Sequence, residues 1–231
     1  MMNPEMIPIL EETLRFGPAT VLTNGTIFKD SWLERLQALM ASTRYSLEFR
    51  VSIDGFSPET NDPIRGEGTF QRALRGVQQL VSTGFLPIIT AARTWEEEDE
   101  PQIVQQFVTV LREAGYARPR LKLLPRLKMG AEADRTEGYR NDERVTEQML
   151  AEVDPAQFLC HHSRIVTDRG VHVCPLLIEE PKSVMGETLS DSLRPFALEH
   201  GACFTCYQYG AICSNATVYQ IEANDPSPST E

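Results

Sequence analysis

The sequence predicts an α/β protein in which a parallel β-sheet is followed by a small cysteine-rich α+β extension. Helical and strand-like segments alternate along the first half of the chain with only a few residues between them. This rhythm is typical of βα units that build a parallel sheet. All five cysteines lie at or after Cys160. Because the soft ligands are grouped in one part of the chain, we expect a local metal or iron–sulfur site there.

The predicted helices carry apolar residues at helical spacing and end near glycine or proline. In the second of them, Trp32, Leu33, Leu36, Leu39 and Met40 form one apolar stripe. The helices of the sheet region are predicted over residues 4–16, 30–41, 69–82 and 101–114. Two later helices are predicted over residues 141–152 and 189–200.

The predicted strands are short apolar or β-branched segments that end in turn residues. They cover residues 19–23, 46–53, 85–91 and 120–125. In a parallel sheet the carboxyl ends of the strands lie on one rim, where functional groups gather. Small and polar residues follow all four strands, at residues 23–25, 52–55, 90–93 and 126–132. Turn chemistry alone explains any one Asn-Gly or Asp-Gly pair, but the shared rim favours a ligand-facing edge.

Cys160 and Cys174 flank a predicted hairpin that turns at residues 168–170. Cys203 and Cys206 form a C-x-x-C pair after the last predicted helix. A hairpin places its two arms side by side, and a C-x-x-C loop directs two thiolates toward one point. We therefore expect these four sulfurs to converge on one site, as a [4Fe–4S] cluster requires.

The fifth cysteine, Cys213, is expected to be spare or to compete with the other four. His161, His162 and His172 lie close to these cysteines in the sequence. Structural zinc with cysteine and histidine ligands is therefore a competing interpretation. Two disulfides with one spare thiol are a further alternative, which a reducing compartment disfavours.

Composition and charge exclude several classes of protein. The net charge of −11 argues against a nucleic-acid-binding surface, which needs a basic patch. The sequence has no apolar segment long enough to span a membrane. Its first residues, MMNPE, have neither the basic region nor the apolar region of a signal peptide. We expect a cytoplasmic protein, without nucleic-acid or membrane partners.

Several segments together resemble the radical S-adenosylmethionine (radical SAM) enzymes. Residues 51–55 (VSIDG), 62–66 (DPIRG), 68–70 (GTF) and 80–85 (LVSTGF) are similar to the fourth strand and following helix of that family. Residues 4–5 (PE) leading to 22–26 (LTNGT) resemble its second helix and third strand. The cysteine spacing after residue 159 resembles the auxiliary-cluster extension called SPASM or, in its shorter form, twitch.

The resemblance implies an incomplete parallel (β/α) partial TIM barrel with about four of the family's six βα units. It divides the chain into a barrel over residues 1–152, a SPASM/twitch-like iron–sulfur extension over 153–220 and a disordered tail over 221–231. The C-x3-C-x2-C loop and the Gly-Gly-Glu-Pro motif of the family do not occur among the 231 residues of this sequence. We therefore expect a chain that is truncated at its N-terminus relative to the family, a fragment that is inactive alone.

The resemblance also implies cofactors and their contacts. Full-length relatives cleave S-adenosylmethionine reductively to a 5′-deoxyadenosyl radical, which abstracts hydrogen from a peptide or small metabolite. By this resemblance Ser52 and Asp54 lie near the ribose and methionine of the cofactor, and Thr23 and Asn24 face the substrate cavity. Arg93 is expected to neutralise a carboxylate, with a surface salt bridge as the alternative.

The expected cofactors are an auxiliary [4Fe–4S] cluster and, for the family, S-adenosylmethionine. The expected partners are a peptide or small-molecule substrate and a reductant such as ferredoxin or flavodoxin. Two other functions fit the same residues: an iron–sulfur or zinc module without catalysis, and a non-functional fragment. The fold and the cofactor do not identify the substrate.

Overall fold

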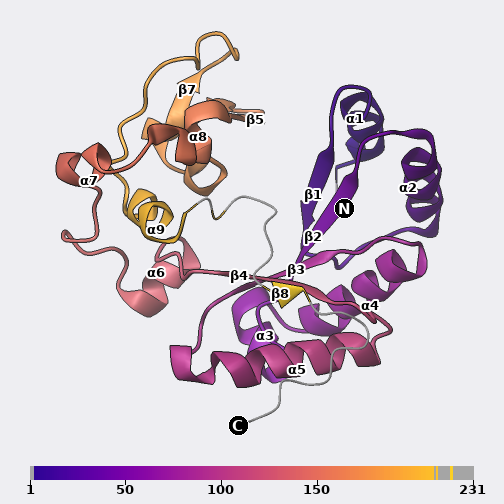
Figure 1. The fold of residues 1–231 in the computed structure, drawn as a ribbon. Helices are drawn as coiled ribbons and strands as arrows, with labels where there is room; N and C mark the ends of the chain where they lie inside the picture. The colour runs from indigo at the N-terminus through magenta and orange to yellow at the C-terminus, as the bar shows by residue number, and fades with distance from the viewer. Residues whose placement is uncertain (1–2, 211, 213–218, 221–231) are drawn as a thin grey trace. The chain divides into compact units, whose positions relative to one another are not determined.

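The computed structural model describes residues 3–210, 212 and 219–220. The chain forms two compact units, one of Met1–Leu124 with Ala216–Glu231 and one of Pro125–Asn215 (Figure 1). This division follows the fourth strand directly, whereas the sequence placed a domain boundary at 152/153. Among the described residues, no helix combines the length and apolar character that crossing a membrane requires.

The first unit contains a sheet whose four long strands are parallel, as predicted. In spatial order they are β1 (Ala19–Thr23), β2 (Leu47–Ser52), β3 (Ile88–Ala92) and β4 (Arg120–Leu124). The short strand β8 (Tyr219–Gln220), which the sequence did not predict, pairs antiparallel with β4. Within the described residues β1 forms the edge of the sheet, and its Leu22 is 66% exposed.

Helices of the first unit pack against one face of this sheet (Figure 1). They are α1 (Met6–Thr13), α2 (Asp30–Ser42), α4 (Thr69–Ser82) and α5 (Glu100–Glu113), with a 3-10 turn at Glu97–Asp99. Helix α3 (Pro58–Arg65) packs against α4. The core between helices and strands includes Phe49, Val77, Ile89 and Leu121, all almost fully buried. Such burial of apolar surface is the main stabilising contribution to the unit.

The opposite face of the strands is polar, which a strand periodicity of two permits. Arg50, Thr90 and Lys122 are each about 5% exposed, and the strand register places Thr90 beside Lys122. The Nε of Arg50 donates to Thr90 Oγ1 at 3.4 Å. Two positive charges therefore lie on one buried polar face, where the sequence analysis expected only apolar strands.

One strand boundary and one helix of the first unit differ from the prediction. The third strand begins at Ile88 rather than at residue 85, because the Phe85 N–H donates to Leu80 O at 3.0 Å and closes the end of α4. Gly84, with φ +89, makes that reversal possible. Helix α3 was not predicted, although Ser57 followed by proline is a common helix start.

The second unit holds short elements. Its helices are α6 (Ala131–Thr136), α7 (Glu147–Ala151), α8 (Leu159–His162) and α9 (Gly201–Tyr209), with 3-10 turns at Pro155–Gln157, Pro175–Leu177 and Pro181–Ser183. An antiparallel sheet joins β5 (Ile165–Thr167), β6 (Gly170–His172) and β7 (Val184–Gly186). The predicted hairpin around residues 168–170 is therefore confirmed.

The helix predicted over residues 141–152 is wrong for its first half. Glu143 accepts the Arg140 N–H at 2.9 Å and contacts Lys128 Nζ at 2.5 Å, which folds this segment into a turn. Helix α7 begins only after Thr146, whose Oγ1 accepts the Met149 N–H at 3.2 Å. A side-chain cap thus sets the start of the helix.

Tyr116 gives the first unit a pH-dependent stability. Its ring is 1% exposed, its hydroxyl donates to Pro87 O at 2.7 Å, and burial raises its pKa from 10.0 to about 12. Because the unfolded chain ionises first, we expect full stability below pH 10.0 and a loss as the pH rises to about 12. Urea midpoints measured at several pH values should fall in this window, and Tyr116→Phe should flatten the fall.

Candidate metal centre and cofactor rim

The four described cysteines come from three elements of the second unit. Cys160 lies on α8, Cys174 follows β6, and Cys203 and Cys206 lie on α9. The spacing of three residues places Cys203 and Cys206 on neighbouring turns of one helix face. Cys213, the fifth predicted ligand, and the predicted tail at 221–231 lie outside the described residues.

The helix predicted over residues 189–200 does not form, and the C-x-x-C pair lies on a helix rather than on a loop. Pro195 lies inside this segment and has no N–H for a helical hydrogen bond. The Ser192 carbonyl accepts the Arg164 Nε–H at 3.0 Å. Helix α9 starts later, where His200 Nδ1 accepts the Ala202 N–H at 3.0 Å.

Helix α9 is held by a close contact at its first residue. Gly201 is buried, and a Cβ there would lie 2.1 Å from the Tyr139 ring. The Tyr139 hydroxyl also shares a 2.8 Å hydrogen bond with Thr205 Oγ1. These contacts set the position of the helix that presents two of the cysteines.

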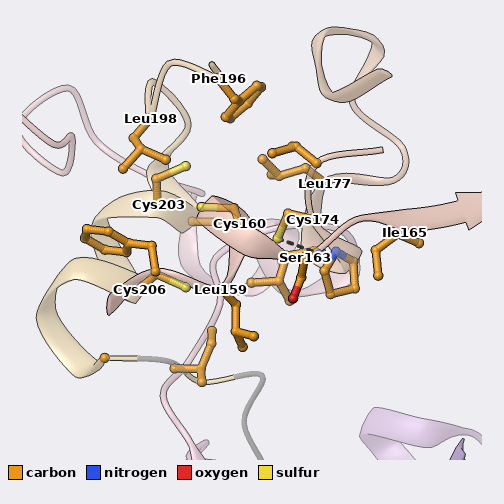
Figure 2. A pocket seen from close by; sticks show the side chains of 17 residues that line it. Leu159, Cys160, Ser163, Ile165, Cys174, Leu177, Phe196, Leu198, Cys203 and Cys206 are labelled. Carbon is orange, nitrogen blue, oxygen red and sulfur yellow. Dashed lines mark hydrogen bonds between the residues drawn. The ribbon is translucent and has the colours of Figure 1, made fainter. Parts of the chain in front are cut away.

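The four thiols line one apolar cavity of about 50 Å³ (Figure 2). Its other walls include Leu159, Leu177, Phe196 and Leu198. Figure 2 shows the side chains of Cys160, Cys174, Cys203 and Cys206 among the residues around this cavity. One water needs about 10–15 Å³ of such space, so the cavity has room for a group of several atoms.

Burial controls the ionisation of these thiols. It raises the pKa of Cys160, of Cys174 and, to about 11, of Cys203. The neighbouring Cys160 and Cys174 raise the pKa of Cys203 further. Without a metal the three thiols are therefore protonated at neutral pH, and binding a thiophilic group would release protons.

The four cysteine side chains do not have the arrangement of a complete metal-ligand set in this structure. None of the four is in a disulfide bond, and the Cys174 Sγ accepts the Leu176 N–H at 3.4 Å. Within the described ranges, no three His, Cys, Asp or Glu side chains are grouped closely enough to hold a metal ion. The thiols thus share a cavity, and ligation by them stays a prediction.

The histidines near the cysteines do not line this cavity. His161 and His162 are exposed on α8, and His172 is 1% exposed with its Nδ1 2.9 Å from Ser183 Oγ. The cavity therefore offers sulfur ligands, together with the hydroxyl of Ser163. This donor set suits an iron–sulfur cluster better than a mixed cysteine–histidine zinc site.

The predicted cofactor residues lie at the carboxyl ends of the first three strands. Asp54 is 5% exposed, and its carboxylate accepts the Ala92 N–H at 2.7 Å and lies 2.7 Å from Arg65 Nε. The Asp54 N–H in turn donates to Asn61 Oδ1 at 3.0 Å. Asp54 thus ties the ends of β2 and β3 to α3, and Ser52 lies beside it as the half-buried last residue of β2.

The other predicted rim residues take part in local contacts. Thr23 Oγ1 accepts the Gly25 N–H at 3.1 Å, and Asn24 Oδ1 accepts the Thr26 N–H at 3.2 Å. Arg93 Nε lies 2.6 Å from Glu100 Oε2, which agrees with the salt-bridge alternative. Cofactor or substrate binding by these side chains stays a prediction.

Removal of the Asp54 carboxylate should destabilise the first unit. In Asp54→Ala the Ala92 N–H and Arg65 lose their partner, and leaving buried donors unpaired costs about 1–3 kcal/mol. Urea unfolding should show this loss, while Glu59→Ala at an exposed position of α3 should change the midpoint little. Equal midpoints for the two variants would contradict the structural role of Asp54.

Part of the chain is similar in sequence to known proteins. No family model matches it. A stretch of 82 residues is 35% identical to mycofactocin maturase MftC of Mycobacterium tuberculosis, and covers 34% of this chain and 20% of that protein. The protein of the same name from Mycolicibacterium smegmatis is 30% identical over 67 residues. These matches support the radical SAM resemblance that the sequence motifs indicate.

Solved structures agree with this chain in fold. The anSMEcpe structure with bound AdoMet (S-adenosylmethionine) aligns with a TM-score of 0.54 and 16% identity, over 84% of this chain and 60% of that one. Streptococcus suis SuiB bound to S-adenosylmethionine aligns with a TM-score of 0.51 and 15% identity, over 84% of this chain and 51% of that one. The four parallel strands are therefore those of the radical SAM partial barrel.

Three residues of these sites were not assigned from the sequence. Arg65 and Asn61 fix Asp54 from α3, at sequence separations that no periodicity marks. Arg164 holds the segment before α9 and also donates to Cys160 O at 2.7 Å. Ser57 and Pro58 start α3, and this Ser-Pro pair is the only sequence signal that could have indicated the helix carrying Asn61 and Arg65.

Proposed function

We propose that this radical SAM family chain carries an auxiliary [4Fe–4S] cluster of the SPASM/twitch kind, ligated by Cys160, Cys174, Cys203 and Cys206. The observation that supports this most is the gathering of four thiols, from three elements, around one apolar cavity. Such a cluster, when bound, supplies a site for electron transfer. The protein's own part is to bring the four thiolates together and to exclude water with Leu177, Phe196 and Leu198.

We propose a peptide as the substrate of the whole protein. The support is in the names of similar proteins: MftC is called a maturase, and a further anSMEcpe structure, with a TM-score of 0.53, holds a Cp18Cys peptide. The matched segment spans 20% of MftC. Activity, substrate and reductant are therefore proposals for this chain.

We propose that Ser52 and Asp54 border the S-adenosylmethionine site. Their place at the carboxyl end of β2 supports this, since ligands of such folds bind at that rim. The Asp54 carboxylate has bonds to Ala92 and Arg65 already, so its role toward the cofactor would be to order the backbone around it. Because the C-x3-C-x2-C loop does not occur in these 231 residues, we expect this chain alone not to cleave the cofactor.

Anaerobic reconstitution with iron and sulfide tests the cluster. We expect the full chain to turn brown and to bind a [4Fe–4S] cluster, as measured by visible absorption and by iron and sulfide analysis. A colourless protein with one tightly bound zinc would favour the structural-metal module instead. A chain that binds neither metal would support the non-functional fragment.

Cofactor cleavage is tested separately on the reduced, reconstituted chain. Chromatography after incubation with S-adenosylmethionine should detect no 5′-deoxyadenosine above the level without protein. Formation of 5′-deoxyadenosine in repeated turnovers would overturn the expected inactivity, without affecting the proposal of an auxiliary cluster.

A further inference from the structure

A second hollow lies beside the cysteine cavity in the second unit. This cleft has a volume of about 530 Å³ and is lined by residues of α8 and of the segment 193–198. Ligand sites commonly enclose about 300–1,000 Å³, so the cleft is large enough for a few residues of a peptide. Cys160, Phe158, Phe196 and Leu198 line both hollows.

The charge of the cleft is opposite to that of the chain. The chain carries a net charge of −11, yet no aspartate or glutamate lines the cleft, while Arg164 and Arg194 do. Arg164 donates to the carbonyls of Cys160, Ser163 and Ser192. Within the described residues neither arginine is paired with a carboxylate. Because carbonyl groups carry no net charge, both positive charges are available to an anion.

Arg194 has hydrogen-bond donors left for such an anion. Its Nε donates to Met185 O at 3.1 Å and its Nη2 to Val184 O at 3.2 Å. A guanidinium has five N–H donors, so three are not used by these bonds. The two bonds also fix the side chain, which reduces the entropy lost when a ligand binds.

Apart from His161 and Cys160, the remaining walls of the cleft are apolar. They include Pro155, Phe158, Leu193, Pro195, Phe196 and Leu198. Leu193 is 73% exposed, so its side chain is accessible to a ligand in the cleft. The cleft therefore combines cationic donors with apolar contacts, and suits a ligand that has a carboxylate on an apolar body.

We propose that this cleft binds an acidic residue of a peptide together with a bulky apolar neighbour, the carboxylate contacting Arg194. The choice of a peptide rests on the peptide substrate proposed above. The concave shape and small volume also favour a short segment over the surface of a folded protein, whose specific interfaces bury more than about 1,000 Å². Arg164 has the role of positioning the segment that carries Arg194.

Fluorescence anisotropy with the full chain tests the proposal. The probes are fluorescein-labelled hexapeptides with a Leu-Glu-Phe centre, and with Leu-Gln-Phe and Leu-Lys-Phe as matched controls. We expect the glutamate peptide to bind, and Arg194→Gln to weaken it by about tenfold or more, as the loss of a charged hydrogen bond implies. Arg169→Gln removes the same charge from an arginine that pairs with Glu179 outside the cleft, and should change the affinity little.

The glutamine and lysine peptides test the same contact without altering the protein, so a poorly folded Arg194→Gln variant would not obscure the result. Equal affinity for the glutamate and lysine peptides would overturn the proposal. So would displacement of the probe by free phenylacetate as strongly as by unlabelled peptide, which indicates a small-acid site. Displacement by flavodoxin that depends on Arg194 would overturn it in favour of an acidic protein partner.

The measurement is made before and after iron–sulfur reconstitution. Peptide binding by a chain that takes up no cluster would support the cleft and contradict the cluster. A chain that takes up the cluster but does not bind the peptide would support the cluster and contradict the cleft.

Discussion

Replacement of Cys174 by alanine is expected to abolish the visible absorption of the reconstituted protein and most of its bound iron. Cys174 is presented by the turn after β6, where the Leu176 N–H already donates to its sulfur at 3.4 Å. A donor to the sulfur lowers its negative charge and stabilises the thiolate form. The expected loss is large because a [4Fe–4S] cluster depends on four thiolate ligands.

Ser163→Ala is the matched control for this experiment. Ser163 lines the same cavity but has no thiol, so its replacement should leave iron content and absorption unchanged. Cys206→Ala should behave as Cys174→Ala does, while Cys213→Ala should weaken the absorption less. Full iron content in Cys174→Ala would remove this residue from the ligand set, and with it the proposed four-cysteine cluster.

Replacement of Gly76 by alanine is expected to destabilise the first unit, although Gly76 lies within helix α4. Helix propensity alone predicts the opposite, since alanine is favoured over glycine by about 1 kcal/mol in a helix. A Cβ at Gly76 would lie 2.0 Å from Gly25 O and 3.1 Å from the Phe28 ring. The backbone of the turn after β1 would have to move, and such overpacking costs about 1–3 kcal/mol.

The urea midpoint of the Gly76→Ala protein measures this cost. Gln71→Ala, at an exposed position of the same helix, serves as the control. It should change the free energy of unfolding by no more than about 0.5 kcal/mol in either direction. A urea midpoint of Gly76→Ala above that of the unmodified protein would contradict this prediction. It would mean that the turn after β1 accommodates the added Cβ without loss of stability.

The sequence of the first unit carries enough local information to predict its fold. Helix α4 was predicted with its observed bounds because an apolar stripe and a glycine after its C-terminus agree. The strand β1 was also predicted correctly, as a β-branched segment that ends at an Asn-Gly turn. Hydrophobic periodicity and turn chemistry are local properties, and both can be read without knowing which elements meet.

The second unit was predicted less well because its elements are short and are fixed by distant side chains. In the segment 189–200, where the predicted helix does not form, the Ser192 carbonyl accepts a hydrogen bond from Arg164, which lies 28 residues earlier. The late start of α7 depends on Glu143 contacting Lys128 across a loop. No period within either segment records these contacts.

The parallel βα architecture, the hairpin and the candidate cysteine ligands could all be predicted from spacing along the chain. The contacts of those side chains could be found only in the folded protein. It gave the Asp54 carboxylate to Ala92 and Arg65, placed four thiols around one cavity, and opened an acid-free cleft beside Cys160. The physical reason is that packing brings together groups far apart in sequence, and their burial and charge are properties of the assembled neighbours.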